Sequence, residues 1–201
     1  MTKRDPVRCP WGGIENAEYQ RYHDVEWGVP HSDSRAHLEK LCLEGFQSGL
    51  SWLTILKKRE NFRRAFAGFD PEKVARFGER DVARLLADAG IVRHEGKIRA
   101  TIDNARAVLA LSERMALSHF LWGFLDGRPI INRHERFSDI PSETPLSKQI
   151  SKALKAEGFR FVGPTTVYAF LQSSGFVNDH LVSCHRHAPC AKHMRSFKLA
   201  E

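Results

Sequence analysis

The sequence lacks any long apolar run, and no stretch approaches the roughly 18 consecutive apolar residues that a membrane-spanning helix needs. Its first residues, MTKRDPVRCP, are basic, but no apolar segment follows them, so we expect no signal peptide. Only four cysteines are present. Together these absences predict a cytoplasmic protein that makes no membrane contact and whose thiols stay reduced.

The motifs of several common enzyme classes are also missing. The sequence contains no Walker loop, no Rossmann glycine pattern and no evident pairing of a nucleophile with a base, so those classes have little support. No internal repeat or low-complexity tract stands out, and 201 residues suffice for one domain with a proper core. We therefore expect a single domain over residues 1–201.

Strand-like alternation is almost absent, whereas apolar residues recur at helical spacing throughout the chain. The predicted fold class is therefore all-α, a compact bundle of many short helices. Asp33 or Ser34 and Asp70 are expected N-caps, and Gly175 is an expected helix stop. The ranges expected to be helical are 34–48, 61–68, a segment from 71, 79–89, 90–112, 119–125 (or a buried turn), 147–157 and 165–174, with a loop over 127–147.

Within residues 79–112, the pattern predicts two helices joined by a tight turn at Gly90, where a side chain would strain the backbone. Arg93, His94 and Lys97 follow this turn and can add positive charge where the second helix offers backbone amides to a phosphate. An ordinary helical hairpin with a solvated basic face explains the same pattern. The net charge of +7 suits a polyanionic partner but specifies none.

Cysteine and histidine residues gather near the two ends of the chain. His180 and Cys184 are four residues apart, and Cys9 and His23 lie near the other end, which makes a Cys₂His₂ set suited to tetrahedral zinc. Spacing alone does not show that residues so distant in sequence bind one metal ion. The same residues are equally explained as ordinary core or surface residues that bind no metal. The candidate ligands at the C-terminal end also include His185, His187, Cys190 and His193.

A carboxylate stands in an unusually apolar setting. Glu44 lies in the run CLEGFQSGLSW and must be paired or face a cavity if it is buried, although a glutamate on the helix surface explains it as well. Cys42 and Trp122 are expected in the core. The first 52 residues also hold several aromatic residues, which form either core or a binding surface: Trp11, Tyr19, Tyr22, Trp27 and Trp52.

Long segments of the chain resemble the 3-methyladenine DNA glycosylase I family of the helix-hairpin-helix superfamily. The likeness runs from Cys9 to about Cys184 and is carried by the segments YHDVEWGVP, LCLEGFQSGLSWLTILKKRENFR, DAGIVRHEGKI, NARA, GFRFVG and GFVNDHLVSC. The resemblance implies a monofunctional hydrolase of DNA base-excision repair. Such an enzyme releases free 3-methyladenine from alkylated double-stranded DNA by breaking the N-glycosidic bond, without strand cleavage.

The resemblance also implies roles for individual residues. One structural zinc ion is expected, bound by terminal segments 9–23 and 180–184. Glu44 is implied to be the catalytic and base-contacting carboxylate. The remaining implied sites are base contacts at Tyr22, Trp52, Trp11 and Trp27, DNA contacts at Gly49, Leu50, Gly90, Arg93, His94 and Lys97, and zinc ligands at Cys9, His23, His180 and Cys184.

Three positions depart from the family pattern. Phe46, Ser48 and Pro164 stand where that pattern has Gln, Ala and Thr, and Phe46 is expected to affect the shape of the pocket or the approach of DNA. Two other functions stay open on the residues alone: a zinc-dependent hydrolase or nuclease, and a non-catalytic DNA-binding module that uses only the hairpin. We expect a monomer.

Overall fold

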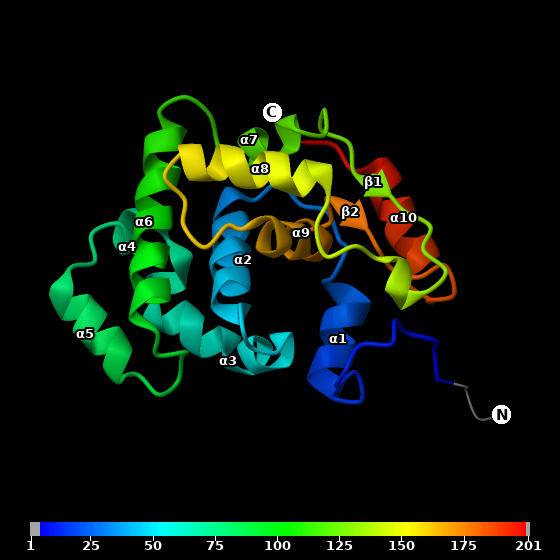
Figure 1. Cartoon of the computed structure of the whole chain (residues 1–201), viewed down its shortest axis with the longest axis horizontal. Helices are drawn as coiled ribbons and strands as arrows, with labels where there is room; N and C mark the ends of the chain where they lie inside the picture. The colour runs from blue at the N-terminus through cyan, green and yellow to red at the C-terminus, as the bar shows by residue number, and fades with distance from the viewer. Residues whose placement is uncertain (1–4, 200–201) are drawn as a thin grey trace.

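The computed structural model describes residues 5–199, and almost all of its regular structure is helical, which confirms the predicted all-α class (Figure 1). A parallel pair of two-residue strands is the only sheet in the described part. In chain order the elements are α1 (Ala17–Val25), α2 (Ser34–Gln47), α3 (Trp52–Ala65), a 3₁₀ turn (Ala67–Phe69), α4 (Pro71–Val74), α5 (Glu79–Ala87), α6 (Glu95–Ser112), α7 (Leu117–Gly123), β1 (Ile130–Ile131), a second 3₁₀ turn (Phe137–Asp139), α8 (Pro145–Ala156), α9 (Pro164–Ser173), β2 (Val177–Asn178) and α10 (His187–Ser196).

Helix α2 is the centre of the molecule, and α3, α6, α7 and α9 all pack against it (Figure 1). Asp33 caps it, since its side chain accepts hydrogen bonds from the backbone amides of Arg35 and Ala36. Leu38 and Leu41 are buried on the helix and belong to the main core, as does Trp122 of α7. The apolar sequence of α2 is explained by this burial on several sides.

The turn after α9 requires glycine for two reasons. Gly175 has a φ of +73°, and a Cβ atom there would lie 2.2 Å from the backbone nitrogen of Pro30. This close packing joins the end of α9 to the segment before α2. The predicted helix stop at Gly175 is therefore confirmed.

Segments near the two ends of the chain, around Cys9 and residues 181–184, meet at one side of the bundle. Strand β1 pairs with β2, with Ile130 opposite Val177 and Ile131 opposite Asn178. The chain that follows β2 then runs beside the segment around Cys9, and α10 lies next to the strand pair (Figure 1). Residues separated by most of the sequence thus become neighbours.

The predicted tight turn between α5 and α6 is wrong in length and in mechanism. Residues 88–94 separate the helices, and Gly90 does not have a positive φ. Instead, Asp88 Oδ1 accepts a hydrogen bond of 2.7 Å from the Gly90 amide, and Asn61 Nδ2 donates to the Gly90 carbonyl. A Cβ atom at Gly90 would lie 2.8 Å from that aspartate oxygen, so close contact explains the glycine.

Other helix limits also differ from expectation. The short helix expected over 61–68 is the end of the longer α3, whose start at Trp52 was not predicted. The segment 127–147 holds β1, a 3₁₀ turn and the first turn of α8. His180 and Cys184 lie outside the helices and strands, in the segment between β2 and α10, and α10 was not predicted. No helix in the described part is long and apolar enough to cross a membrane.

Candidate functional site

Four buried side chains from the two ends of the chain form one cluster: Cys9, His23, His180 and Cys184. Their ligand-type atoms all lie within 4.8 Å of one another. Cys184 Sγ is 3.5 Å from His23 Nε2 and 3.6 Å from His180 Nδ1, and Cys9 Sγ is also 3.6 Å from His180 Nδ1. Two sulfurs and two imidazole nitrogens that converge in this way can hold one metal ion.

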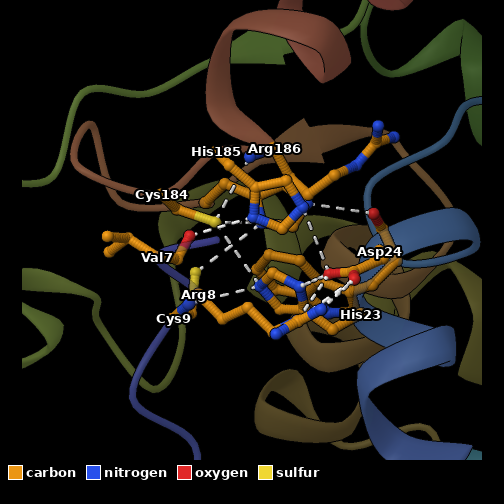
Figure 2. A network of polar contacts seen from close by, with 10 residues as sticks. Val7, Arg8, Cys9, His23, Asp24, Cys184, His185 and Arg186 are labelled. Carbon is orange, nitrogen blue, oxygen red and sulfur yellow. Dashed lines mark hydrogen bonds and ion pairs between the residues drawn. The ribbon is translucent and has the colours of Figure 1, made fainter. Parts of the chain in front are cut away.

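A second layer of contacts orients the two imidazole rings, and Figure 2 shows this layer around His23. His23 Nδ1 lies 2.8 Å from Asp24 Oδ1, and Arg8 donates to the same carboxylate at 2.7 Å. His180 Nε2 lies 3.2 Å from the carbonyl oxygen of Trp27. In both rings the nitrogen away from the thiols has an acceptor, so the other nitrogen is left facing the thiols as a ligand.

The remaining histidines and cysteine of the C-terminal end serve other contacts. Cys190 Sγ donates to the carbonyl of Gly28 at 2.8 Å, and His187 Nε2 lies 2.9 Å from the carbonyl of Asn132. His185 Nδ1 lies 2.9 Å from the carbonyl of Val7. None of them joins the cluster.

A cavity of about 490 Å³ lies next to this cluster. All five residues expected to bind the base line it, and they come from the N-terminal segment, α1 and the turn that follows it, α2 and α3. Helix α9 and the segment 137–142 complete the wall. The lining residues are Trp11, Gly12, Tyr19, Tyr22, Trp27, Glu44, Gln47, Trp52, Phe137, Ile140, Pro141, Ser142, Thr165, Tyr168, Ala169 and Gln172.

Glu44 is the one acidic residue among these lining residues, and only 5% of it is exposed. Ser173 Oγ on α9 donates a 3.0 Å hydrogen bond to Glu44 Oε1. Burial raises the pKa of Glu44 to about 7, while the charge of Lys40 and the Ser173 hydrogen bond oppose the rise. Glu44 therefore faces a cavity, which excludes the helix-surface alternative.

The aromatic side chains of the cavity pack in a chain that reaches the cluster of Cys9, His23, His180 and Cys184. Tyr22 and Trp52 have ring centroids 5.4 Å apart, and Trp11 lies 4.8 Å from Trp27. Trp11 also makes an edge contact with His23 at 4.8 Å, and Trp27 makes one with His180 at 4.6 Å. The two histidines of the cluster thus pack against the two tryptophans that line this side of the cavity.

A turn beside the cavity presents an apolar side chain to solvent. Gly49 has a φ of +83°, and the following Leu50 is 40% exposed. Gln47 lines the cavity, and its side chain donates to the Leu50 carbonyl. The structure thus brings the residue expected to enter the duplex close to the cavity.

Two of the basic hairpin residues are exposed, whereas the third, Lys97, is buried. Arg93 and His94 are exposed, and His94 Nδ1 accepts a hydrogen bond from the Lys97 amide as the N-cap of α6. Lys97 is only 8% exposed, and its Nζ donates to the carbonyls of Phe46 and Ser48. Its ammonium group therefore holds the end of α2, and its expected contact with DNA stays a prediction.

Sequence reasoning missed two residues that act on Glu44. Ser173 gave no signal, because nothing in the pattern relates the end of α9 to α2. Lys40 precedes Glu44 by four residues on a predicted helix, so their proximity was open to inference. Phe46, expected to affect the pocket, does not line it and packs against Phe62 in the core with ring centroids 4.6 Å apart.

Comparison with known proteins agrees with this arrangement. A family model described as "Methyladenine glycosylase" matches residues 11–187. The chain belongs to the methyladenine glycosylase family. Members of this family that resemble it include DNA-3-methyladenine glycosylase 1 of Escherichia coli (strain K12), which is 51% identical over 178 residues, or 88% of this chain and 95% of the relative.

Solved structures of the family have the same fold. A crystal structure of 3-methyladenine DNA glycosylase I matches with a TM-score of 0.88 and 50% identity, covering 90% of this chain and 100% of that one. The Staphylococcus aureus enzyme, whose structure is described as the basis of its recognition of 3-methyladenine, matches with a TM-score of 0.84 and 40% identity, covering 87% of this chain and 94% of that one.

Proposed function

We propose that this member of the family hydrolyses the N-glycosidic bond of 3-methyladenine in alkylated double-stranded DNA, as a step of base-excision repair. The observation that carries the proposal is the buried carboxylate of Glu44 in a cavity walled by Tyr22 and Trp52. The family relationship supports the same substrate, because similar proteins are named for this activity.

The chemistry of the lesion matches such a cavity. Methylation at N3 makes the adenine cationic, so its glycosidic bond is already weakened and the base leaves as a neutral molecule. An ionised Glu44 attracts the cationic ring and accepts a hydrogen bond from its exocyclic amine, while aromatic faces add cation–π attraction. Unmodified adenine lacks the charge and stays stacked, so the cavity discriminates in favour of the lesion.

The base must leave the duplex to reach the cavity. Extrusion of one base costs a few kcal/mol of stacking and pairing. Leu50, exposed on a turn beside the cavity, would fill the gap that the base leaves. Arg93, His94 and the first amides of α6 would bind the phosphates that flank it.

The metal cluster best suits one structural zinc ion. Tetrahedral zinc holds sulfur at about 2.3 Å and nitrogen at about 2.0 Å, so neighbouring ligand atoms lie roughly 3.5 Å apart. The sulfur–nitrogen distances of 3.5–3.6 Å agree with this spacing. Four protein ligands leave no position for water, so zinc here would join the ends of the chain rather than activate a nucleophile.

The same cavity supports a monofunctional enzyme. Strand cleavage by a glycosylase of the Schiff-base type needs an amine at the reacting sugar, and no lysine is among the described residues that line the cavity. A metal-dependent nuclease would need an open metal position. We also propose a monomer that acts in the cytoplasm.

Chromatography of the bases released from methylated duplex DNA tests the proposal. The chain should release 3-methyladenine, and the duplex should keep its strands intact until alkali or a lyase is added. Binding of duplex without release of any base would support a DNA-binding module instead. Loss of activity that is reversed by metal before the protein unfolds would support a metal-dependent hydrolase.

A further inference from the structure

A lysine lies against two aromatic residues of the cavity without lining the cavity itself. Lys40 Nζ is 4.9 Å from the ring centroid of Tyr22 and 4.9 Å from that of Trp52. It lies on α2 one helical turn before Glu44, and it lines a second cavity of about 260 Å³ next to Ser173. Ser173 donates to Glu44, so the second cavity adjoins the carboxylate from behind.

The charged groups around Lys40 already have partners of their own. Glu26 pairs with Arg59, and Glu39 pairs with Arg63 at 2.7 Å. The close contacts of Lys40 Nζ within the described residues are the two aromatic rings. The ammonium group of Lys40 is therefore held by cation–π contacts with two rings. Its positive charge acts electrostatically on the nearby carboxylate of Glu44.

Glu44 faces few other titratable groups. Tyr19 and Tyr22 of α1 face it and have raised pKa values, so both phenols stay neutral near pH 7. Ser173 of α9 is uncharged, and Lys97 of α6 is engaged by backbone carbonyls. Lys40 is thus the cation in position to stabilise the charged form of Glu44.

We propose that Lys40 is a positioning residue for base excision, whose ammonium group, fixed against Tyr22 and Trp52, keeps the Glu44 carboxylate ionised before the base enters. This inference rests on the proposed function of the cavity. Two opposing effects shape it: burial raises the pKa of Glu44 to about 7, and Lys40 limits that rise. Burial also lowers the pKa of Lys40 to about 8, so the ammonium form is present where Glu44 titrates.

The size of the effect follows from Coulomb's law. A unit charge one helical turn away in a partly buried setting shifts a carboxyl pKa by about one unit. Without Lys40, the ionised fraction of Glu44 would fall roughly fivefold at pH 7 and roughly tenfold at pH 6, and hardly change at pH 9. The loss should therefore depend on pH, which a loss of packing alone would not produce.

Single-turnover excision of 3-methyladenine by the full chain across pH 5.5–9 tests this inference. Lys40→Met should move the acidic limb of the rate profile upward by about one pH unit and leave the rate near pH 9 unchanged. Lys40→Arg should keep the wild-type limb, because the charge is retained. Lys152→Met, which removes an exposed charge on α8, should also keep it. The double variant Lys40→Met with Glu44→Gln should have the same pH profile as Glu44→Gln alone, because the carboxyl group on which Lys40 acts is then absent.

Three results would overturn the inference: an unshifted limb in Lys40→Met, an equal loss at every pH, or a gain from relief of repulsion between Lys40 and the cationic base. Carboxyl-carbon NMR of Glu44, assigned with Glu44→Gln, gives a readout independent of activity and should show the same upward shift. If Lys40→Met fails to fold, Lys40→Gln serves in its place. A wild-type chain that releases no 3-methyladenine would defeat the proposed function, whereas the NMR titration would still test Lys40.

Discussion

Lys97 Nζ lies 2.6 Å from the carbonyl oxygen of Ser48, so the first turn of α6 is tied to the turn that carries Gly49 and Leu50. A second hydrogen bond of 2.9 Å reaches the carbonyl of Phe46. These carbonyls lie at the end of α2, where a cation also complements the helix dipole. The predicted hairpin and the predicted duplex-entering turn are thus one connected unit.

Lys97→Met should show whether Lys97 supports DNA binding by holding the turn after α2 or by contacting a phosphate with its charge. The variant keeps the apolar stem but leaves the carbonyls of Phe46 and Ser48 without their donor, so we expect weaker binding of lesion-containing duplex with an unchanged salt slope. Arg93→Ala, the matched change at an exposed cation, should flatten that slope by about 0.9, the loss of one phosphate contact. Duplex titrations at several salt concentrations measure both. A flattened slope for Lys97→Met would show that its ammonium contacts a phosphate after all.

Leu50→Ala should weaken binding of a duplex that contains a lesion or an abasic site by roughly tenfold, because a partly exposed leucine loses the apolar surface that would fill the gap. Thermal stability should hardly change, since 40% of Leu50 is already exposed. Met115→Ala, at an exposed apolar residue beside α7, is the control and should leave duplex binding intact. Equal affinity of wild type and Leu50→Ala for the lesion duplex would contradict the insertion of this residue.

Glu44→Gln should stabilise the fold above neutral pH. Because burial raises the pKa of Glu44 from 4.5 to about 7, the folded state holds this proton more tightly than the unfolded state. Wild type therefore loses stability as pH rises from 4.5 through 7, by roughly 3 kcal/mol in total, and glutamine avoids that loss. Denaturant titrations should show a gain for the variant at pH 8 that vanishes near pH 4. A gain of equal size at both pH values would mean that Glu44 is not responsible.

Cys184→Ser should remove the bound zinc and lower the thermal midpoint, because the cluster closes a loop that spans most of the chain. Cys190→Ser is the matched control, since Cys190 Sγ donates to the carbonyl of Gly28 outside the cluster. Elemental analysis should find one zinc ion per chain in wild type and in Cys190→Ser. Wild-type protein that is as stable without metal as with it would contradict a structural role for zinc.

Local signals in the sequence predicted much of the fold. The cap at Asp33, the Asp70-Pro71 helix start and the stop at Gly175 depend on neighbouring residues, and all three are confirmed. The turn at Gly90 was misjudged because its form depends on a side chain from α3, Asn61, and on the carboxylate of Asp88. Contacts of that kind are tertiary, so the hydrophobic pattern of the segment does not contain them.

The candidate site likewise contains residues that could be predicted from the sequence and residues that depend on tertiary contacts. The family resemblance implied five residues that line the cavity and the four members of the Cys/His cluster, and the structure brings both sets together. Residues that tune those groups were missed, or their burial was not predicted. Ser173 contacts Glu44 from a helix that is far from α2 in sequence but packs against it. Lys97 is buried, although the polar sequence around it is typical of an exposed segment.

The most direct test of the central claim compares wild type with Glu44→Gln in single-turnover release of 3-methyladenine from methylated duplex at pH 8, where the carboxylate is ionised. Glutamine retains the size of the side chain and can keep the Ser173 hydrogen bond, but it lacks the charge that attracts a cationic base. The variant should release the base roughly tenfold to a hundredfold more slowly, as expected for the loss of a charged hydrogen bond. Equal rates for the two proteins would contradict it.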